Sequence, residues 1–203
     1  MPGFQLKVDG KELVTVSSEN LNILSIRVQG DVVGQELASI YVSGGNFGGE
    51  SEDTYLIWID DFRLTAPNKL DIQFLEAVSN SKPGRTPKEL HPESDDEKQV
   101  PLDEPDLAQQ LKALGEELER RPKTRDSFLL QMRSPNGEAA TFKTTQDDFS
   151  FSLTAMWRST RASSASVWLS TATIDSIVQQ RDSERLASER LGFNDKIEFT
   201  VGT

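Results

Sequence analysis

The sequence has no cysteine and a single histidine, His91, and these two scarcities exclude several kinds of chemistry. Without cysteine there is no disulfide framework, zinc–thiolate site, iron–sulfur cluster or cysteine nucleophile. One histidine cannot make a two-histidine metal site, and His91 lies in a polar stretch, residues 89–97, that is typical of a solvated loop. We therefore expect no metal and no cofactor, and the composition favours a protein that is not an enzyme.

Long apolar runs and clustered basic residues are also lacking. No stretch approaches the roughly 18 uncharged apolar residues of a membrane span, and the first residues do not combine a basic region with an apolar core. The chain carries 22 basic against 33 acidic residues, a formal net charge of −11. Because phosphate contacts need clustered lysine and arginine, this balance argues against nucleic acid as a partner. We expect a cytoplasmic protein that does not bind membranes.

The negative charge is unevenly distributed along the chain. Residues 1–78 carry 12 acids against 5 bases, and residues 89–119 carry 11 against 2. Residues 127–203 are nearly balanced, with 9 acids against 8 bases. Such an acidic surface would attract and steer a basic protein partner, although the needs of solubility explain the same numbers.

Alternating apolar and polar residues predict several β-strands with one buried face. The apolar positions lie in four segments of the N-terminal part, 4–8, 24–28, 38–42 and 70–74. A fifth segment, 55–59, is apolar at every position and is typical of a strand buried on both faces. We therefore predict a mainly β protein, α+β overall, built from two small antiparallel β-sandwich or barrel-like modules.

The two modules are predicted to be an internal duplication. When the N-terminal part is shifted by 127 positions, residues 38–43 fall on 165–170 and residues 24–28 fall on 151–155, with matching patterns. Residues 68–72 likewise fall on 195–199. The opening segment, 4–8, matches 128–132, and the turn that follows is three residues longer in the second module. Shared strand alternation without common ancestry is the alternative explanation.

Composition divides the chain into four segments. We predict an acidic β module over 1–78, a flexible acidic linker over 79–102, a leucine-striped helix over 103–122 and a second β-rich module over 126–203. The linker has almost no apolar side chain to bury, which is typical of a flexible segment. The helix starts at an acidic, proline-containing first turn, and its leucines must pack on this chain or on a second copy.

The second module is predicted to contain a helix of its own, near 173–190. Ile174, Ile177 and Val178 lie on one face at helical spacing, and the six charged residues of 181–190 lie elsewhere. This helix would replace the strand 55–59 of the first module.

A glycine-rich loop at 44–49 and the carboxylates around it form the first candidate site. Acidic residues follow the loop at once, so it is unsuited to phosphate, whereas Phe47 at its tip is a plausible anchor for a protein partner. The carboxylates Glu50, Glu52, Asp53, Asp60 and Asp61 would contribute to an acidic binding face. Alternatively, they converge as a calcium-binding module or a carboxylate-based hydrolase.

The second candidate site combines aromatic and guanidinium groups. Trp157, Arg158 and Arg161 are residue types that are enriched at binding hot spots, although a turn with solvated arginines is the plainer interpretation. The sequence therefore favours a non-enzymatic, acidic protein-binding module of the immunity or inhibitor type that neutralises a basic partner. A structural subunit that self-associates into a homo-oligomer is the alternative from another class.

Overall fold

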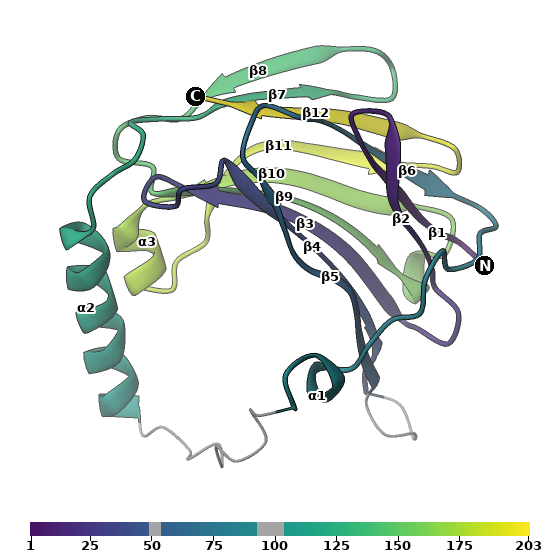
Figure 1. Cartoon of the computed structure of the whole chain (residues 1–203), viewed down its shortest axis with the longest axis horizontal. Coiled ribbons are helices and arrows are strands. Elements are labelled where there is room, and N and C mark those ends of the chain that lie inside the picture. Colours follow the sequence, from purple (N-terminus) through teal and green to yellow (C-terminus); the bar gives the residue numbers. More distant parts are fainter. Residues whose placement is uncertain (49–53, 93–103) are drawn as a thin grey trace.

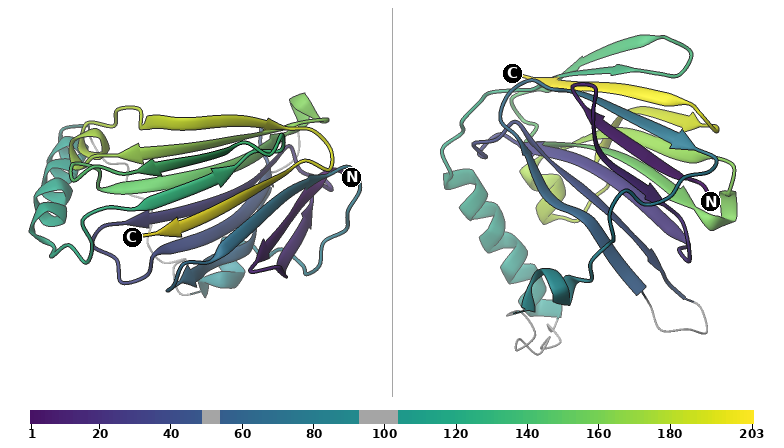
Figure 2. Two further views of the ribbon diagram at one scale, coloured as in Figure 1. Left: turned by 90° about the horizontal axis from the view of Figure 1, so that it is seen from above. Right: turned by 45° about the vertical axis from the view of Figure 1, so that its right-hand side comes forward.

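The computed structural model describes residues 1–48, 54–92 and 104–203, with no side-chain detail for 104–106. Two six-stranded antiparallel sheets lie face to face (Figures 1 and 2). Three helices, α1 (Pro87–Leu90), α2 (Glu104–Arg120) and α3 (Ile174–Val178), lie outside the two sheets in the described part of the chain. The mainly β, antiparallel character predicted for the two sandwich-like modules is confirmed, as are the connecting helix and a helix in the second module.

Each sheet combines strands from both predicted copies, which we call the first copy (residues 1–78) and the second copy (126–203). Sheet A has the order β2-β1-β6-β12-β7-β8, and sheet B has the order β11-β10-β9-β3-β4-β5. The strands of sheet A are β1 (Gly3–Val8), β2 (Lys11–Ser17), β6 (Lys69–Leu75), β7 (Leu129–Arg133), β8 (Ala139–Lys143) and β12 (Lys196–Gly202). The strands of sheet B are β3 (Ile23–Asp31), β4 (Ala38–Asn46), β5 (Thr54–Leu64), β9 (Ser150–Arg158), β10 (Ala165–Ala172) and β11 (Glu184–Leu191).

The two copies share one hydrophobic core. Alternate residues of strands from both sheets meet between the sheets, and 34 buried residues form one cluster that draws on both copies. Phe4 and Phe74 of the first copy contact each other there, as do Phe128 and Phe151 of the second. Phe151 also lies 6.2 Å from Phe199 of sheet A, measured between ring centroids. The copies are therefore halves of one sandwich that is packed around a common interior.

Strand pairing between the copies follows the sequence shift of 127. In the β3–β9 pair, Arg27 lies opposite Thr154, and these residues are 127 positions apart. In the β6–β12 pair, Asp71 lies opposite Glu198, which is the same separation. Both antiparallel registers are therefore consistent with a pseudo-twofold axis that passes through the β3–β9 and β6–β12 pairs. This axis relates each residue to its counterpart in the other copy. This arrangement is what an internal duplication predicts.

The opening strands match with an offset that differs from the sequence prediction. Phe4 lies opposite Phe74, and the position equivalent to Phe74 is Val201, which lies opposite Leu130. Phe4 is therefore the counterpart of Leu130 and not of Phe128, a correction of two residues that keeps the buried face the same. The following turn is longer in the second copy, as predicted, because β8 begins at Ala139.

The helix predicted near 173–190 is much shorter than expected. Helix α3 covers Ile174–Val178, and Gln180 then adopts a positive φ of 50°, which ends the helical turn. After a short loop, Glu184–Leu191 form β11, which pairs with β10 as β5 pairs with β4. The second copy therefore keeps the strand that the sequence suggested it had lost.

Helix α2 agrees with the prediction of a helix over 103–122 and packs within the chain. Its Gly115 is buried so close to α3 that a Cβ atom there would lie 2.6 Å from Val178 Cγ2. Leu118 contacts the edge of the core, whereas Leu107 and Leu114 remain more than a third exposed. Asp103, the first residue of the predicted helix, lies outside the described residues.

The first part of the predicted flexible linker forms ordered backbone contacts, and we call residues 79–86 the strap. Ser81 exchanges hydrogen bonds with Thr15 of β2, and Arg85 forms a two-bond β-bridge with Ile57 of β5. A threonine-capped turn, α1, follows. The strap therefore covers the edges of both sheets in the first copy; residues 93–102 of the predicted linker lie outside the described part.

Candidate interaction face

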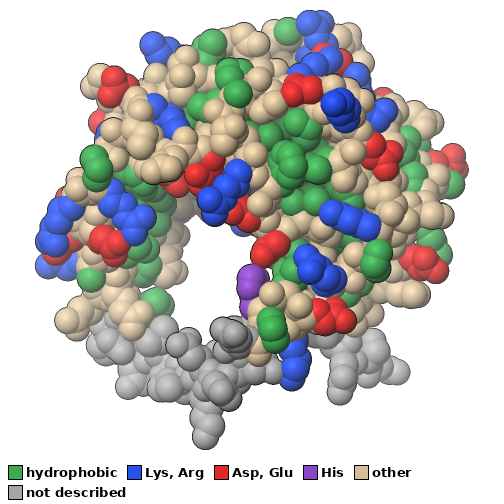
Figure 3. Space-filling model, in the orientation of Figure 1, with side chains coloured by type: hydrophobic (Ala, Val, Ile, Leu, Met, Phe, Trp, Pro, Cys, Tyr) green, Lys and Arg blue, Asp and Glu red, His purple; other side chains and the backbone are tan. Residues whose placement is uncertain are grey.

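The outer face of sheet B, the face turned away from the core, is a curved polar surface. It borders a hollow whose other side is formed by α2 (Figures 1 and 3). Hydroxyl groups prevail on it because the apolar alternate residues face the core. The residues that carry it are Ser25, Arg27, Gln29, Ser39, Tyr41, Ser43, Ser152, Thr154, Met156, Arg158, Ser166, Trp168 and Ser170.

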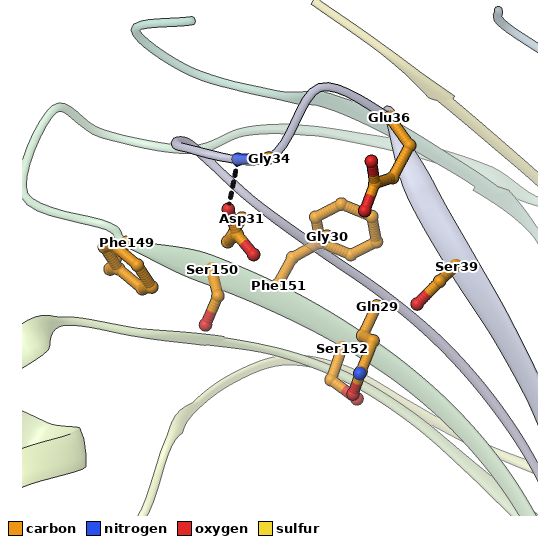
Figure 4. Close-up of a pocket in the computed structure, with 10 residues that line it drawn as sticks. All are labelled: Gln29, Gly30, Asp31, Gly34, Glu36, Ser39, Phe149, Ser150, Phe151 and Ser152. Atoms are coloured by element: carbon orange, nitrogen blue, oxygen red, sulfur yellow. Dashed lines mark hydrogen bonds between the residues drawn. The ribbon is translucent and has the colours of Figure 1, made fainter. Parts of the chain in front are cut away.

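An acidic pocket lies at one end of this face, where β3 ends and β4 and β9 begin. It has a volume of about 280 Å³, and its charged lining residues are Asp31 and Glu36 (Figure 4). The Asp31 carboxylate accepts hydrogen bonds from the backbone N–H groups of Val33 and Gly34, at 2.9 and 2.6 Å. The Asp31 carboxylate is therefore fixed in place. The Glu36 carboxylate, in contrast, accepts no hydrogen bond within the described chain.

Arg125 holds the loop that carries these acids. Its guanidinium donates to the carbonyl oxygens of Asp31, Gly34 and Glu36 at 2.8–2.9 Å, and it lies 5.3 Å from the centre of the Phe128 ring. A planar, five-donor group suits several convergent carbonyls better than an ammonium would. The acidic pocket is therefore built on a loop of the first copy that Arg125, the residue just before the second copy, holds in place.

A basic pocket lies at the other end of the face. Its volume is about 270 Å³, and it is lined by Met156, Arg158, Thr160, Arg161, Ser166 and Trp168. Both arginines are exposed, while the Trp168 side chain is half-buried on the sheet. A guanidinium pair beside an indole suits an anionic group that carries an apolar or planar part.

These two pockets occupy equivalent places under the pseudo-twofold axis but carry opposite charge. With the shift of 127, Asp31 corresponds to Arg158, and Gly34 corresponds to Arg161. Asp31 lies opposite Ser150 in the sheet, eight residues along β9 from Arg158. At about 3.3 Å per residue, the two charges lie about 26 Å apart.

Two tyrosines pair between β4 and β5, and an Asp–His pair joins β5 to the end of α1. The hydroxyl groups of Tyr41 and Tyr55 form a 2.9 Å hydrogen bond, and Asp60 Oδ2 lies 3.2 Å from His91 Nε2. Burial, together with Tyr55 and the nearby charge of Asp60, raises the pKa of Tyr41 above its usual range. Tyr41 therefore stays protonated at neutral pH and serves as a hydrogen-bonding group, not as a base.

Of the predicted carboxylates, the structure describes two. Asp60 and Asp61 lie within β5, because this strand continues beyond the predicted segment 55–59 to Leu64. Asp60 faces His91, and Asp61 forms a 2.8 Å ion pair with Arg63. Glu50, Glu52 and Asp53 lie outside the described residues. Within the described residues no group of three His, Asp or Glu side chains is arranged to hold a metal ion.

The predicted aromatic anchors have different environments. Phe47 is 39% exposed, and its ring lies 6.1 Å from that of Tyr55, at the open end of β4. Trp157 is 4% exposed and belongs to the core, where its indole N–H donates to the carbonyl of Ala162. Trp157 therefore supports the turn that carries Arg161, while Trp168 on the next strand is the tryptophan of the outer face.

Sequence reasoning missed Asp31, Glu36 and Tyr41 as residues of this face. Tyr41 is the counterpart of Trp168 under the shift of 127, so the duplication itself contained the signal. Asp31 could have been found as the counterpart of Arg158 in the same way.

Comparison with known proteins gives no relative to reason from: no protein-family model, curated protein or solved structure matches the chain. Among the described residues, no helix combines the length and apolar character required to cross a membrane.

Proposed function

We propose that this chain is a non-enzymatic protein-binding module, acting in the cytoplasm, that engages its partner through the outer face of sheet B. The observation that carries the proposal is the opposite charge of two equivalent pockets at the ends of one polar face. Duplication produces like pockets, and these two have diverged to opposite charge. A face with an acid at one end and two arginines at the other favours one orientation of a bound segment.

The partner that fits this face is a protein segment with basic residues at one end and acidic residues at the other. The basic end would meet Asp31 and Glu36, and the acidic end would meet Arg158 and Arg161. Eight extended residues span the distance of about 26 Å between the pockets. Composition alone predicts an acidic binding face. The proposal differs from that prediction because the face has an acidic pocket at one end and a basic pocket at the other.

Fluorescent peptides test the proposal directly. The probe is an extended decapeptide with two lysines at one end, two glutamates at the other and serine, threonine and valine between. Its control has the same composition with the charges interleaved. We expect the polarised peptide to bind at least fivefold more tightly in 50 mM salt, with the preference weakened in 300 mM salt.

Charge-reversal variants locate the binding. The double variant Arg158→Glu/Arg161→Glu and the single variant Glu36→Lys should each abolish the preference for the polarised peptide. Lys11→Glu, at the exposed first residue of β2, is the matched control and should leave the preference unchanged. Equal affinity for both peptides, or equal losses in all three variants, would refute the proposal.

A further inference from the structure

The second copy leaves one strand edge open in each sheet of the described chain. In the described chain, β8 and β11 end their sheets, and neither pairs with a further strand. The equivalent edges of the first copy, β2 and β5, are covered by the strap. The strap on β2 and β5 therefore indicates what kind of segment the equivalent edges of β8 and β11 can bind.

The strap satisfies backbone groups on both first-copy edges. At β2, the N–H of Thr15 donates to Ser81 Oγ, the N–H of Ser81 donates to the Thr15 carbonyl, and the N–H of Ser17 donates to Asn80 Oδ1, at 2.7–2.9 Å. At β5, Ile57 and Arg85 exchange two backbone hydrogen bonds of 2.8 and 2.9 Å. One short segment thereby closes both sheets on that side.

The second copy presents the same backbone positions without a partner from the described part of the chain. Thr141 lies opposite Gln131 as Thr15 lies opposite Gln5, and Arg185 lies opposite Ser170 as Ile57 lies opposite Ser43. Thr15 is buried beneath the strap, whereas Thr141 and Arg185 are exposed. Within the described residues, no hydrogen bond from outside the sheets reaches either of these two edge positions.

The apolar residues beneath the strand edges are also more exposed in the second copy than in the first. Four positions of the first copy are buried, and their four counterparts in the second copy are partly exposed. The buried residues are Val14, Val16, Trp58 and Ile59, and their counterparts are Ala140, Phe142, Leu186 and Ala187.

Trp58 and Leu186 make the equivalence specific. Each is the extra residue of a β-bulge at the same place in its edge strand, between the positions that face residues 42 and 43 or residues 169 and 170. Gly84 of the strap passes directly over Trp58, since a Cβ atom on Gly84 would lie 3.0 Å from the indole. Leu186 is partly exposed, and none of the glycines that the structure describes approaches it in this way.

We propose that the open side of the second copy, formed by the edges of β8 and β11, binds an extended segment of a partner protein as the first copy binds its strap. The segment would place a serine or asparagine beside Thr141, a glycine over Leu186 and a backbone bridge at Arg185. A second copy of this chain is the poorer occupant, because Lys143, Glu184 and Glu189 put charges along these edges, which disfavour edge-to-edge pairing of two sheets.

The strap itself supplies the probe. Residue 76 of the first copy corresponds to Thr203, so a copy of residues 77–86 appended after Thr203 would enter in register. Tethering gives the segment a high effective concentration. We expect the extended chain to show at least tenfold slower amide hydrogen exchange at Thr141 and Arg185, with Val14 and Val16 unchanged. The matched control carries a scrambled extension of the same composition and should not slow exchange.

Two variants and one further measurement keep this inference refutable. Thr141→Pro removes the edge N–H, and Leu186→Glu charges the covered surface; each should restore fast exchange at Arg185 in the extended chain, while native tryptophan fluorescence reports that the fold is kept. Equal exchange with both extensions would overturn the inference. A dimer of the unextended chain that already protects Thr141 would overturn the choice of partner. Neither result depends on the peptide binding of the outer face.

Discussion

Asp71 and Glu198 lie directly opposite one another where β6 meets β12, on the pseudo-twofold axis of the molecule. Two carboxylates at such a position repel unless cations lie between them. Lys69 Nζ lies 3.0 Å from Glu198, and Lys196 Nζ lies 2.8 Å from Glu198 and 3.7 Å from Asp71. The lysines are themselves counterparts under the shift of 127, so one Lys–acid pair from each copy makes a symmetric cluster at the junction.

Acid should weaken this junction. The hydrogen bond from Lys196, followed by that from Lys69, lowers the pKa of Glu198 from 4.5 to about 2. A carboxylate with a lowered pKa in the folded state stabilises that state above its unfolded pKa, and the stabilisation is lost as the pH falls from about 4.5 to about 2. Glu198→Gln should cost about 1 kcal/mol at pH 7 and much less at pH 2.5. Urea unfolding of both proteins at the two pH values measures this, and a cost independent of pH would contradict it.

Gly115 in α2 should resist replacement despite the usual gain in helix propensity. Alanine is favoured over glycine by about 1 kcal/mol inside a helix, but its Cβ would lie 2.6 Å from Val178 Cγ2. We expect Gly115→Ala to destabilise the protein by about 1 kcal/mol. Val178→Ala should remove the clash, so that Gly115→Ala becomes neutral or stabilising in that background. A double-mutant cycle by thermal unfolding measures the coupling, and additive effects would exclude close packing of α2 on α3.

Arg125 should stabilise the loop of the acidic pocket. Replacing it by alanine removes a charged donor from four carbonyl groups and should cost about 2–3 kcal/mol. Lysine should recover less than half of that loss, because an ammonium cannot reproduce the planar set of donors. Amide exchange at Gly34 should accelerate in the alanine variant and stay unchanged at Gly10, in a distant hairpin turn. Equal stability of the lysine variant and the natural protein would contradict this role.

The two neighbouring tryptophans of the second copy should have different roles, one in the stability of the fold and the other in peptide binding. Trp157 is buried in the core, so Trp157→Ala should cost about 3–5 kcal/mol. Trp168→Ala, on the half-buried outer face, should cost about 1 kcal/mol and abolish the preference for the polarised peptide. Unfolding curves and peptide titrations on both variants measure the two effects. A stable Trp157→Ala protein that lost peptide binding would reverse these assignments.

Alternation and duplication were the parts of the fold that could be predicted from sequence. Both follow from side-chain periodicity, which is a local property, and the shift of 127 located β3, β4, β6 and their counterparts correctly. The residue type of Trp157 predicts a binding site, although Trp157 continues the buried series Phe151, Leu153 and Ala155. Because Trp157 lies two residues after Ala155, the same alternation assigns its side chain to the core.

The two elements that differ from prediction depend on contacts that composition does not encode. Residues 79–86 lack apolar side chains, yet they are ordered by backbone hydrogen bonds to two strand edges. In the second copy, charged residues along β11 mimic the polar face of a helix, and only pairing with β10 makes them a strand. The acidic pocket likewise depends on the meeting of β3, β4 and β9, which the linear sequence does not display.

The pseudo-twofold axis also determines how this protein must fold during synthesis. Strands β3 and β6 pair with strands that the ribosome adds about 127 residues later. The nascent first copy therefore exposes two inner strand edges until β9 and β12 emerge, which is a state of high contact order and high risk of aggregation. We expect refolding to be slow for a protein of this size, and chaperones to act on the half-synthesised chain.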